Sequence, residues 1–204
     1  LEAPPDYGPN SSIFRGTSAV NAWLEQCDAV MDGGRETADV VVLDNITSFW
    51  SWAQRMDETA LKRWRHSLWF TILRSLQAQV GLHALDAADA ATGTAGPAGL
   101  TVGARTYKTI LVAAGGIMTG SAFRRLQEAA ASGTRVVWFG NGPAKLAEES
   151  GALAPAPAPA GEVRPELEPS LAWCRANLPV QAKVGGAQAK ECYVRRFRAE
   201  DGSE

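Results

Sequence analysis

The chain has 204 residues, of which 46% are hydrophobic, so it can bury a core of domain size and hold part of a second domain. Its formal net charge of −2 argues against the basic surface that nucleic-acid-binding proteins present to phosphates. No apolar run reaches the ~20 residues that a membrane-spanning helix needs. We therefore expect neither a nucleic-acid nor a membrane partner. The densest basic cluster, Lys62-Arg63-Trp64-Arg65-His66, is predicted to be a solvated helix face.

The first quarter of the chain predicts a lead-in, a helix and a buried strand. Residues 1–16 are rich in Pro, Gly, Asn and Ser, which is typical of an extended segment. Apolar residues from Val20 to Met31 recur at helical spacing and predict a helix over 17–33. The β-branched run at 39–43 predicts a buried strand that ends at Asp44 and Asn45. A loop with Phe49, Trp50 and Trp52 is expected to follow.

The second quarter predicts the longest helix, over about 57–80, with an apolar stripe from Leu61 to Leu76 that Trp69 and Leu73 widen. A short strand over 82–85 follows. Residues 87–99, AADAATGTAGPAG, have low complexity and predict a loose surface loop.

The stretch from Tyr107 to Gly140 has the most legible pattern and predicts a strand–helix–strand unit. The strand 109–114 is broken by Gly115 and Gly116, and Thr119 or Ser121 can cap the helix that follows. Gly133 suits the C-terminal cap, and 135–139 is a second buried strand. Strands and helices alternate from residue 39 onward, which predicts a parallel sheet in an α/β sandwich over residues 17–150.

The last quarter predicts connecting segments and the start of another domain. We expect a short helical piece at 144–150, a semi-rigid Pro/Ala spacer at 151–165, and a helix with a linker over 166–190. Residues 191–199 have the composition of a strand, and Asp201-Gly202 is a hairpin signal. Because a lone hairpin is not stable by itself, residues 191–204 are interpreted as the truncated start of a β domain.

Candidate site residues follow from the predicted topology, because an open parallel sheet binds ligands outside the carboxyl ends of its strands. Gly115 and Gly116 would let an anion approach the backbone near a helix start, or they form a simple tight turn. The sequence contains no G-x-G-x-x-G and no phosphate-binding P-loop pattern, which favours the turn. The residues predicted at this edge are Asp44, Asn45, Asp86, Gly115, Gly116, Asn141 and Gly142.

Two further features leave alternatives open. Trp50 and Trp52 would stack on a sugar, anchor an interface between domains or subunits, or fold back as a lid over the sheet. Asp44 and Asp86 end strands that would be neighbours, so they would either form a carboxylate pair such as a glycosidase uses or lie solvated in loops.

Metal and cofactor chemistry has no support in the sequence. His66 and His83 are the only histidines, and neither has a ligand residue at a metal-binding spacing. Cys27 and Cys174 lie on apolar helical stripes, which predicts small buried thiols. We expect no metal and no cofactor.

Several of these segments together resemble a known family. ADVVVLDN (38–45), the long Trp-bearing helix, YKTILVAAGG (107–116) and SGTRVVWFG (132–140) are similar to the glutamine amidotransferase-like domain of bacterial glycoside hydrolases. This module is called the β-galactosidase trimerisation domain, and related modules occur in α-L-rhamnosidase-like enzymes. The resemblance implies a flavodoxin-like sheet sandwiched by helices. It also implies a preceding catalytic barrel, reached through 17–33, and a β-sandwich that opens at 191–204.

The same resemblance implies a domain without catalysis of its own. Class I glutamine amidotransferases place a nucleophilic Cys at a sharp elbow after a strand, with a His downstream. The corresponding elbow here carries Asn141, which cannot act as a thiolate, and no His follows it. The expected function is therefore a non-catalytic accessory or scaffolding domain of a glycoside hydrolase. Its partners would be the barrel and β-sandwich of the same polypeptide, further copies in a homo-oligomer, and the parent enzyme's carbohydrate substrate. The alternative is a stand-alone amidotransferase-like or small-molecule-binding α/β protein.

Overall fold

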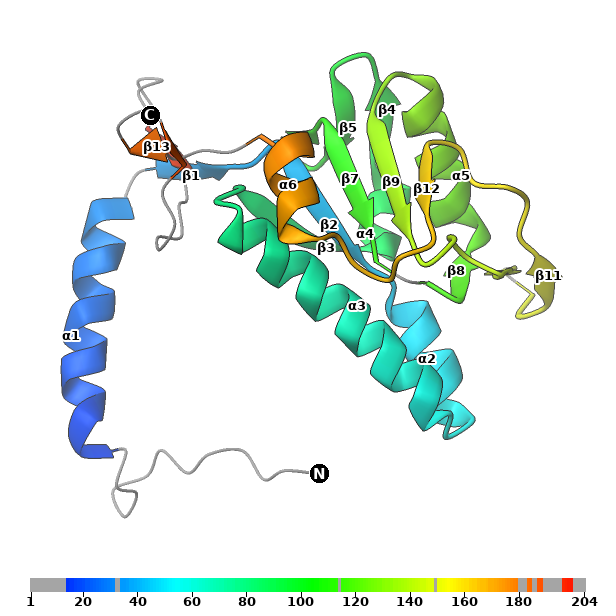
Figure 1. The fold of residues 1–204 in the computed structure, drawn as a ribbon, viewed down its shortest axis with the longest axis horizontal. Coiled ribbons are helices and arrows are strands. Elements are labelled where there is room, and N and C mark those ends of the chain that lie inside the picture. Colours follow the sequence, from blue (N-terminus) through cyan, green and yellow to red (C-terminus); the bar gives the residue numbers. More distant parts are fainter. Residues whose placement is uncertain are drawn as a thin grey trace. The chain divides into compact units, whose positions relative to one another are not determined.

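A computed structural model describes residues 14–31, 34–113, 115–148, 150–179, 183–184, 187–188 and 196–199. The chain forms two compact units, one of residues 37–196 and one of residues 1–36 with 197–204. At the centre of the larger unit lies a five-stranded sheet in the order β12-β9-β7-β2-β3 (Figure 1). All four strand pairs are parallel. The strands are β2 (Val40–Asp44), β3 (Leu82–Asp86), β7 (Thr109–Val112), β9 (Arg135–Phe139) and β12 (Glu162–Arg164).

This strand order confirms the predicted fold class. Counted along the chain, the five strands take the positions 2-1-3-4-5, which is the flavodoxin-like order. The order reverses between β2 and β7, so the topological switch point lies at the carboxyl ends of these two strands. All four strands that the sequence predicted are present, and β12 adds an edge strand beyond β9.

Helices cover both faces of the sheet, and the alternation of strand residues explains why. Val41 and Leu43 pack into one core cluster with α4 (Ala87–Thr92) and α5 (Gly120–Ala131). Val40 and Val42 pack into a second cluster with α3 (Glu58–Gln77) and α6 (Leu171–Asn177). Because apolar side chains are buried on both faces, the central strands read as continuous apolar runs rather than alternating ones.

The predicted strand–helix–strand unit is confirmed, with one short strand added. The strand β8 (Ile117–Thr119) lies between the glycine turn and α5. Thr119 caps α5, because its Oγ1 accepts a hydrogen bond from the backbone N–H of Ala122 at 3.3 Å. At the other end Gly133 has a φ of +99°, the left-handed conformation that favours glycine.

The region 87–99 is ordered structure rather than the loose loop that its composition predicted. It forms α4 and the strands β4 (Thr94–Gly96) and β5 (Gly99–Val102), and β5 also pairs with β6 (Arg105–Tyr107). Ala87, Ala90 and Leu100 are buried in the core. The small side chains of Ala87 and Ala90 let α4 pack against α5, and the low complexity of the stretch gave no indication of this packing.

The region after β9 also departs from the prediction. Residues 145–147 form the strand β10 (Lys145–Ala147) rather than a helix, paired parallel to β8 and antiparallel to β11 (Leu153–Pro155). The segment predicted as a Pro/Ala spacer therefore contains β11 and β12. Its centre is held by Gln127, which accepts from Ala160 N at 2.5 Å and donates to Ala158 O at 3.1 Å. The indole N–H of Trp138 also donates to Ala160 O at 2.7 Å.

The smaller unit contains α1 (Phe14–Met31) and part of a two-stranded sheet of β1 (Gly34–Thr37) and β15 (Arg196–Ala199). Of the strand predicted at 191–199, the described residues 196–199 form β15, paired with a segment that precedes the α/β body, and residues 191–195 lie outside the described part. Asp201-Gly202 lies outside the described residues, so the downstream β domain stays a prediction. The predicted helix at 17–33 is present as α1, and its described side chains, residues 18–26, are exposed.

Cys174 is buried, and burial raises the pKa of its thiol to about 11, as expected for a structural thiol. The side chains of Cys27 and Cys192 lie outside the described part of the chain. Among the described residues, no helix is both long enough and apolar enough to cross a membrane.

Candidate functional site

The carboxyl edge of the sheet brings Asp44 and Asp86 together. They end the adjacent strands β2 and β3 in direct register, so both side chains lie on the same face of the sheet. Burial raises the pKa of Asp44 above its usual range, and the neighbouring Asp86 carboxylate adds to the shift. Asp86 has a structural role, since its Oδ1 accepts from Ala88 N at 2.6 Å and caps α4.

Asn45 occupies the switch point, and its amide nitrogen is bonded inside the protein, whereas its Oδ1 is buried with no hydrogen-bond partner among the described residues. Its side chain is buried, with 1% of its surface exposed. The amide nitrogen donates to Ile117 O at 2.6 Å and to Ser48 Oγ at 3.1 Å. Ser48 donates to the same carbonyl at 2.8 Å and accepts from Ile117 N at 2.9 Å. These bonds join the start of α2 (Ile46–Gln54) to β8.

Gly115 and Gly116 are needed for close packing against these same groups. A Cβ at Gly115 would lie 2.5 Å from the side-chain nitrogen of Asn45. A Cβ at Gly116 would overlap the indole ring of Trp52. The space in which a ligand could have approached the two glycines is therefore filled by an amide and an indole of the chain itself.

Trp50 and Trp52 lie on a helix, so the predicted aromatic loop is wrong in its secondary structure. The run from Ile46 to Gln54 forms α2, whose first turn is anchored by Asn45 and Ser48. Trp52 packs on Gly116, whereas Trp50 has 57% of its surface exposed. Phe49 lies between α2 and α3, with its ring centroid 5.2 Å from that of Trp64. One tryptophan is thus structural, and the other is available to a partner.

Asn141 lies apart from the acidic pair, because β7 separates β9 from β2 in the sheet. It is exposed and has a φ of +70°, between Gly140 and Gly142, which also have positive φ. Its backbone N–H donates to Arg164 O at 3.1 Å. The turn leads into β10 rather than into a helix, so it lacks the strand-to-helix geometry of a nucleophile elbow.

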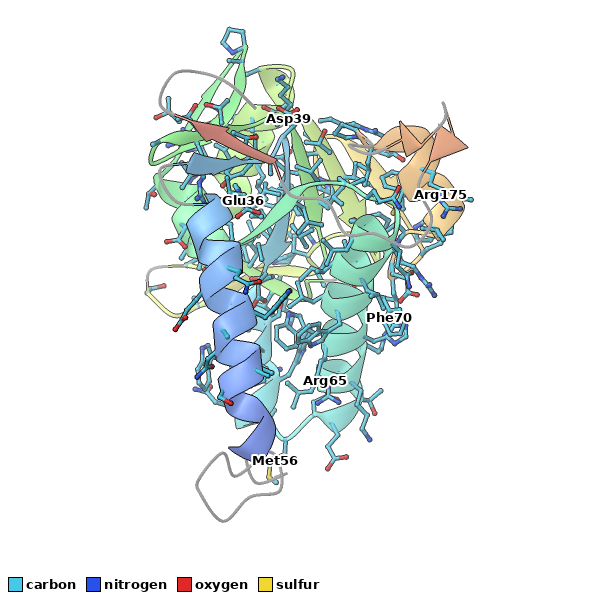
Figure 2. The ribbon with its side chains drawn as sticks, turned by 90° about the vertical axis from the view of Figure 1, so that its left-hand side faces the viewer. Glu36, Asp39, Met56, Arg65, Phe70 and Arg175 are labelled. Carbon is cyan, nitrogen blue, oxygen red and sulfur yellow. The ribbon has the colours of Figure 1, made fainter. Side chains whose placement is uncertain are left out.

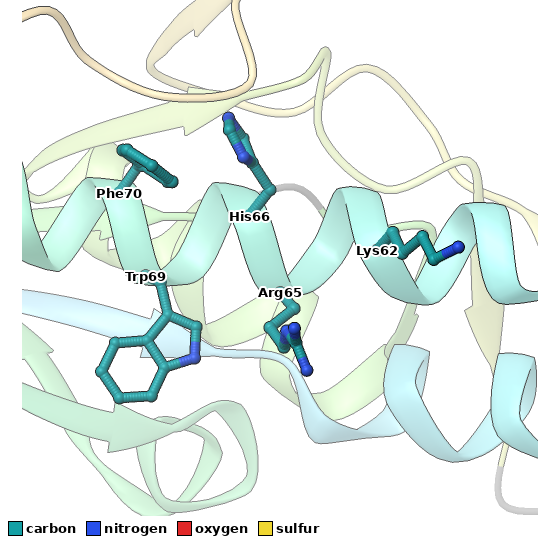
Figure 3. Close-up of a pocket in the computed structure, with 5 residues that line it drawn as sticks. All are labelled: Lys62, Arg65, His66, Trp69 and Phe70. Carbon is teal, nitrogen blue, oxygen red and sulfur yellow. The ribbon is translucent and has the colours of Figure 1, made fainter. Parts of the chain in front are cut away.

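An exposed hollow of about 570 Å³ lies along α3, with Lys62, Arg65, His66, Trp69 and Phe70 around it. Figure 3 shows that Arg65 and Trp69 project from one side of the helix, and His66 and Phe70 from the other. The five side chains therefore form a surface rather than converge on one point. The sequence had predicted a solvated basic face here, and Lys62, Arg63, Arg65 and His66 are indeed exposed. The prediction that Trp69 widens the apolar stripe is wrong, because Trp69 is exposed over 62% of its surface.

Within the described part of the chain, no group of three or more His, Cys, Asp or Glu side chains could hold a metal ion. The arrangement at the carboxyl edge offers two carboxylates on one face and a buried, internally bonded amide at the switch point. It is therefore built mainly for packing α2 and α4 onto the sheet.

No protein-family model matches the chain, and no curated protein matches it. Among solved structures, the chain is similar to Gan42B, a GH42 β-galactosidase, with 14% sequence identity and a TM-score of 0.40. The similarity covers 72% of this chain and 19% of that chain, so this chain spans about a fifth of the enzyme's length. A weak structural neighbour is therefore a glycoside hydrolase, whereas the trimerisation-type assignment stays a prediction from the sequence.

Proposed function

We propose that this chain is a non-catalytic accessory domain of a glycoside hydrolase and that it holds domains or subunits together. The parent activity rests on the sequence resemblance. The observation that carries the scaffolding role is the group of large side chains that α2, α3 and their connection leave exposed. Trp50, Met56 and Trp69 have 57%, 85% and 62% of their surfaces exposed, and Met56 lies in the turn between the two helices (Figure 2).

These residue types support an interface role over a ligand-binding one. Trp, Met and Arg are enriched in protein interfaces, and truncation of Trp or Arg there often costs the most affinity. The α2–α3 hairpin that carries them is bonded to β8 through Ser48 and Asn45, which fixes the start of α2. The switch point, where a small molecule would bind in this fold, is filled by Asn45 and Trp52.

The first test measures the catalytic arm of the proposal. The purified chain is incubated with a panel of nitrophenyl glycosides, and we expect no turnover above that of a denatured control. Turnover of any of these substrates would contradict a non-catalytic role. The same preparation is tested for glutamine hydrolysis, since measurable glutaminase activity would favour the amidotransferase-like alternative.

The second test measures the interface arm with Trp50→Ala. The mass of the wild-type chain and of the variant is measured by sedimentation equilibrium, together with affinity for galactose and rhamnose. We expect the variant to have a lower apparent molecular mass than the wild-type chain at the same protein concentration, with sugar affinity unchanged. If neither mass nor sugar affinity changes, Trp50 serves neither an interface between copies nor a sugar contact.

A further inference from the structure

The two sides of α3 are used differently within the chain. On one side, His66 Nε2 lies 2.6 Å from Glu168 Oε2, and the hydroxyl of Ser67 donates to the carbonyl of Leu167. The ring of Phe70 packs against His66, with centroids 4.3 Å apart, and under the guanidinium of Arg74 at 5.5 Å. The side with His66 and Phe70 is therefore occupied by the chain's own segment 167–168.

On the opposite side, no described segment is bonded to the side chains of Arg65 and Trp69. These two residues are one helical turn apart and project together from α3 (Figure 3). Trp69 is 62% exposed. Arg65 is exposed and has no ion pair or hydrogen bond to any described residue. Its neighbour Lys62 pairs with Glu58 at 3.5 Å, but both side chains are about 80% exposed, so that pair is weak.

The charge of this surface contrasts with that of the whole chain. The chain has 20 Lys and Arg against 22 Asp and Glu, a net charge of −2. Lys62 and Arg65, three positions apart and therefore neighbours on α3, contribute +2, so the remaining residues carry 18 basic against 22 acidic side chains, or −4. A local positive surface on an acidic chain favours an acidic partner and raises its rate of association.

The shape and residue types indicate which acidic partner fits. Nucleic acid needs a longer basic stripe than three cations on one helix. An exposed indole next to an unpaired guanidinium matches the Trp and Arg anchors of protein interfaces, where the guanidinium binds a carboxylate in a bidentate way. Side chains one turn apart on α3 can meet an apolar side chain and a carboxylate that are also one turn apart on a facing helix.

We propose that the Arg65–Trp69 side of α3 docks on a carboxylate-bearing protein surface, with Trp69 packed against an apolar side chain and Arg65 paired with Asp or Glu. This inference rests on the proposed scaffolding function and names the chemistry of the partner. Lys62 and Arg63 add long-range attraction but are not anchors, because lysine is depleted in interface cores and both side chains are exposed.

The test uses the full chain and a defined probe. The probe is a fluorescently labelled helical peptide that carries Leu and Glu one turn apart along one face, and its control has Lys in place of each Glu. Binding is measured by fluorescence anisotropy. We expect the Glu peptide to bind and its affinity to fall as salt is raised, and we expect the Lys peptide not to bind. Absence of binding by the Glu peptide, or equal binding by the Lys peptide, would overturn the proposal.

Three variants localise the binding. Arg65→Glu and Trp69→Ala should each raise the Kd by about tenfold or more, which corresponds to ~1.4 kcal/mol. Arg175→Glu reverses an exposed cation on α6 and should change the Kd by less than about twofold, within the usual range for rim charges. Thermal melting shows that each variant is folded. If Arg175→Glu weakens binding as much as Arg65→Glu, the attraction is non-specific and the docking surface is wrong.

A parallel titration with polygalacturonate distinguishes an acidic saccharide from a protein partner. We expect no binding that depends on both Arg65 and Trp69. Saturable binding that both variants abolish would replace the protein partner by an anionic saccharide and overturn the inference. The readouts are separate from those of the proposed function: failure of peptide binding leaves the mass change of Trp50→Ala intact, whereas glycoside turnover contradicts the accessory role whatever the peptide does.

Discussion

The carboxyl edge of the sheet and the exposed positions of α2 and α3 make opposite use of residues that look alike in the sequence. At the edge, Asn45, Trp52 and the two glycines are locked against each other and against β8. Trp50 on α2 and Trp69 on α3, by contrast, contact solvent over most of their surfaces. A residue at the end of a strand is therefore not always available to a ligand, as Asn45 shows. A tryptophan on a helix is not always part of the core, as Trp50 and Trp69 show.

The largest effect on stability is expected at Gly116, which packs closely against the indole of Trp52. Gly116→Val would place side-chain atoms in the space of the Trp52 indole, and we expect a loss of about 2–3 kcal/mol in the free energy of unfolding. Urea denaturation of the purified variant measures this. Gly96→Ala is the matched control, because a Cβ there meets no atom within 4 Å. Equal stability of the two variants would mean that the indole does not fill the switch point.

The next effect concerns the polar lock at the start of α2. Ser48→Ala removes an acceptor for Ile117 N and a donor to Ile117 O, both buried, so we expect a loss of about 1–3 kcal/mol. Ser121→Ala is the control, since this exposed hydroxyl makes one long bond of 3.4 Å to Thr119. A loss for Ser48→Ala no larger than the control's would show that α2 is held by apolar packing alone.

A smaller effect is expected at the acidic pair, with a sign set by pKa. Because burial and Asp86 raise the folded-state pKa of Asp44, the unfolded chain loses this proton first as pH rises. Stability therefore falls between the unfolded and folded pKa values and stays lower above them. Asp44→Asn should raise stability at neutral pH by under about 1 kcal/mol, since the group is partly solvated.

Glu162 provides the contrast in sign. Burial opposes its ionisation, but hydrogen bonds and charges from Arg135 and Arg164 outweigh it and lower its pKa. Its contribution is present above the unfolded pKa and is lost as pH falls through the folded one. As pH rises from acidic to neutral, the urea midpoint of Glu162→Gln should therefore fall relative to that of the wild-type chain. The midpoint of Asp44→Asn should rise relative to wild type over the same range. A shared direction would contradict the assigned shifts.

The smallest effects on stability are expected at the two exposed tryptophans. Trp50→Ala and Trp69→Ala should each change the free energy of unfolding by less than about 0.5 kcal/mol, as for surface substitutions in general. Thermal or urea denaturation measures this in the isolated chain. A loss above 2 kcal/mol for either would show that the side chain is part of the fold and not available to a partner.

The sequence was sufficient for the central sheet because its strands are strongly apolar and separated by clear helical stripes. Their parallel order, the Thr119 cap and the Gly133 cap followed from local chemistry. The Ala-rich stretch at 87–99 and the Pro-rich stretch at 154–160 were misjudged. Their small or rigid residues carry no periodic signal, and partners distant in sequence, Leu100 with α5 and Ala160 with Gln127, give them their structure.

The position of the candidate site could be predicted from the sequence, but the filling of the switch point by the chain's own side chains could not. Topology correctly placed Asp44 beside Asp86, because parallel strands end at one edge. The switch point is filled because α2 begins directly after Asn45 and returns Ser48 and Trp52 to the glycine turn. The sequence had suggested a loop there, because Phe49, Trp50 and Trp52 lie too close together for an amphipathic stripe to be recognised. The outward direction of Trp69 depends on how α3 is rotated on the sheet, and the sequence left this undetermined because Trp69 lies beside the apolar stripe.

The pairing of β1 with β15 has a consequence for the order in which strand pairs form during folding. Of the strand pairs among the described residues, this one joins the segments farthest apart in the chain. The entropy of closing so long a loop is recovered only after the intervening sequence has become compact. This two-stranded ribbon would therefore be the last pairing gained in folding and the first lost in unfolding, and its formation reports that the whole α/β body has been completed.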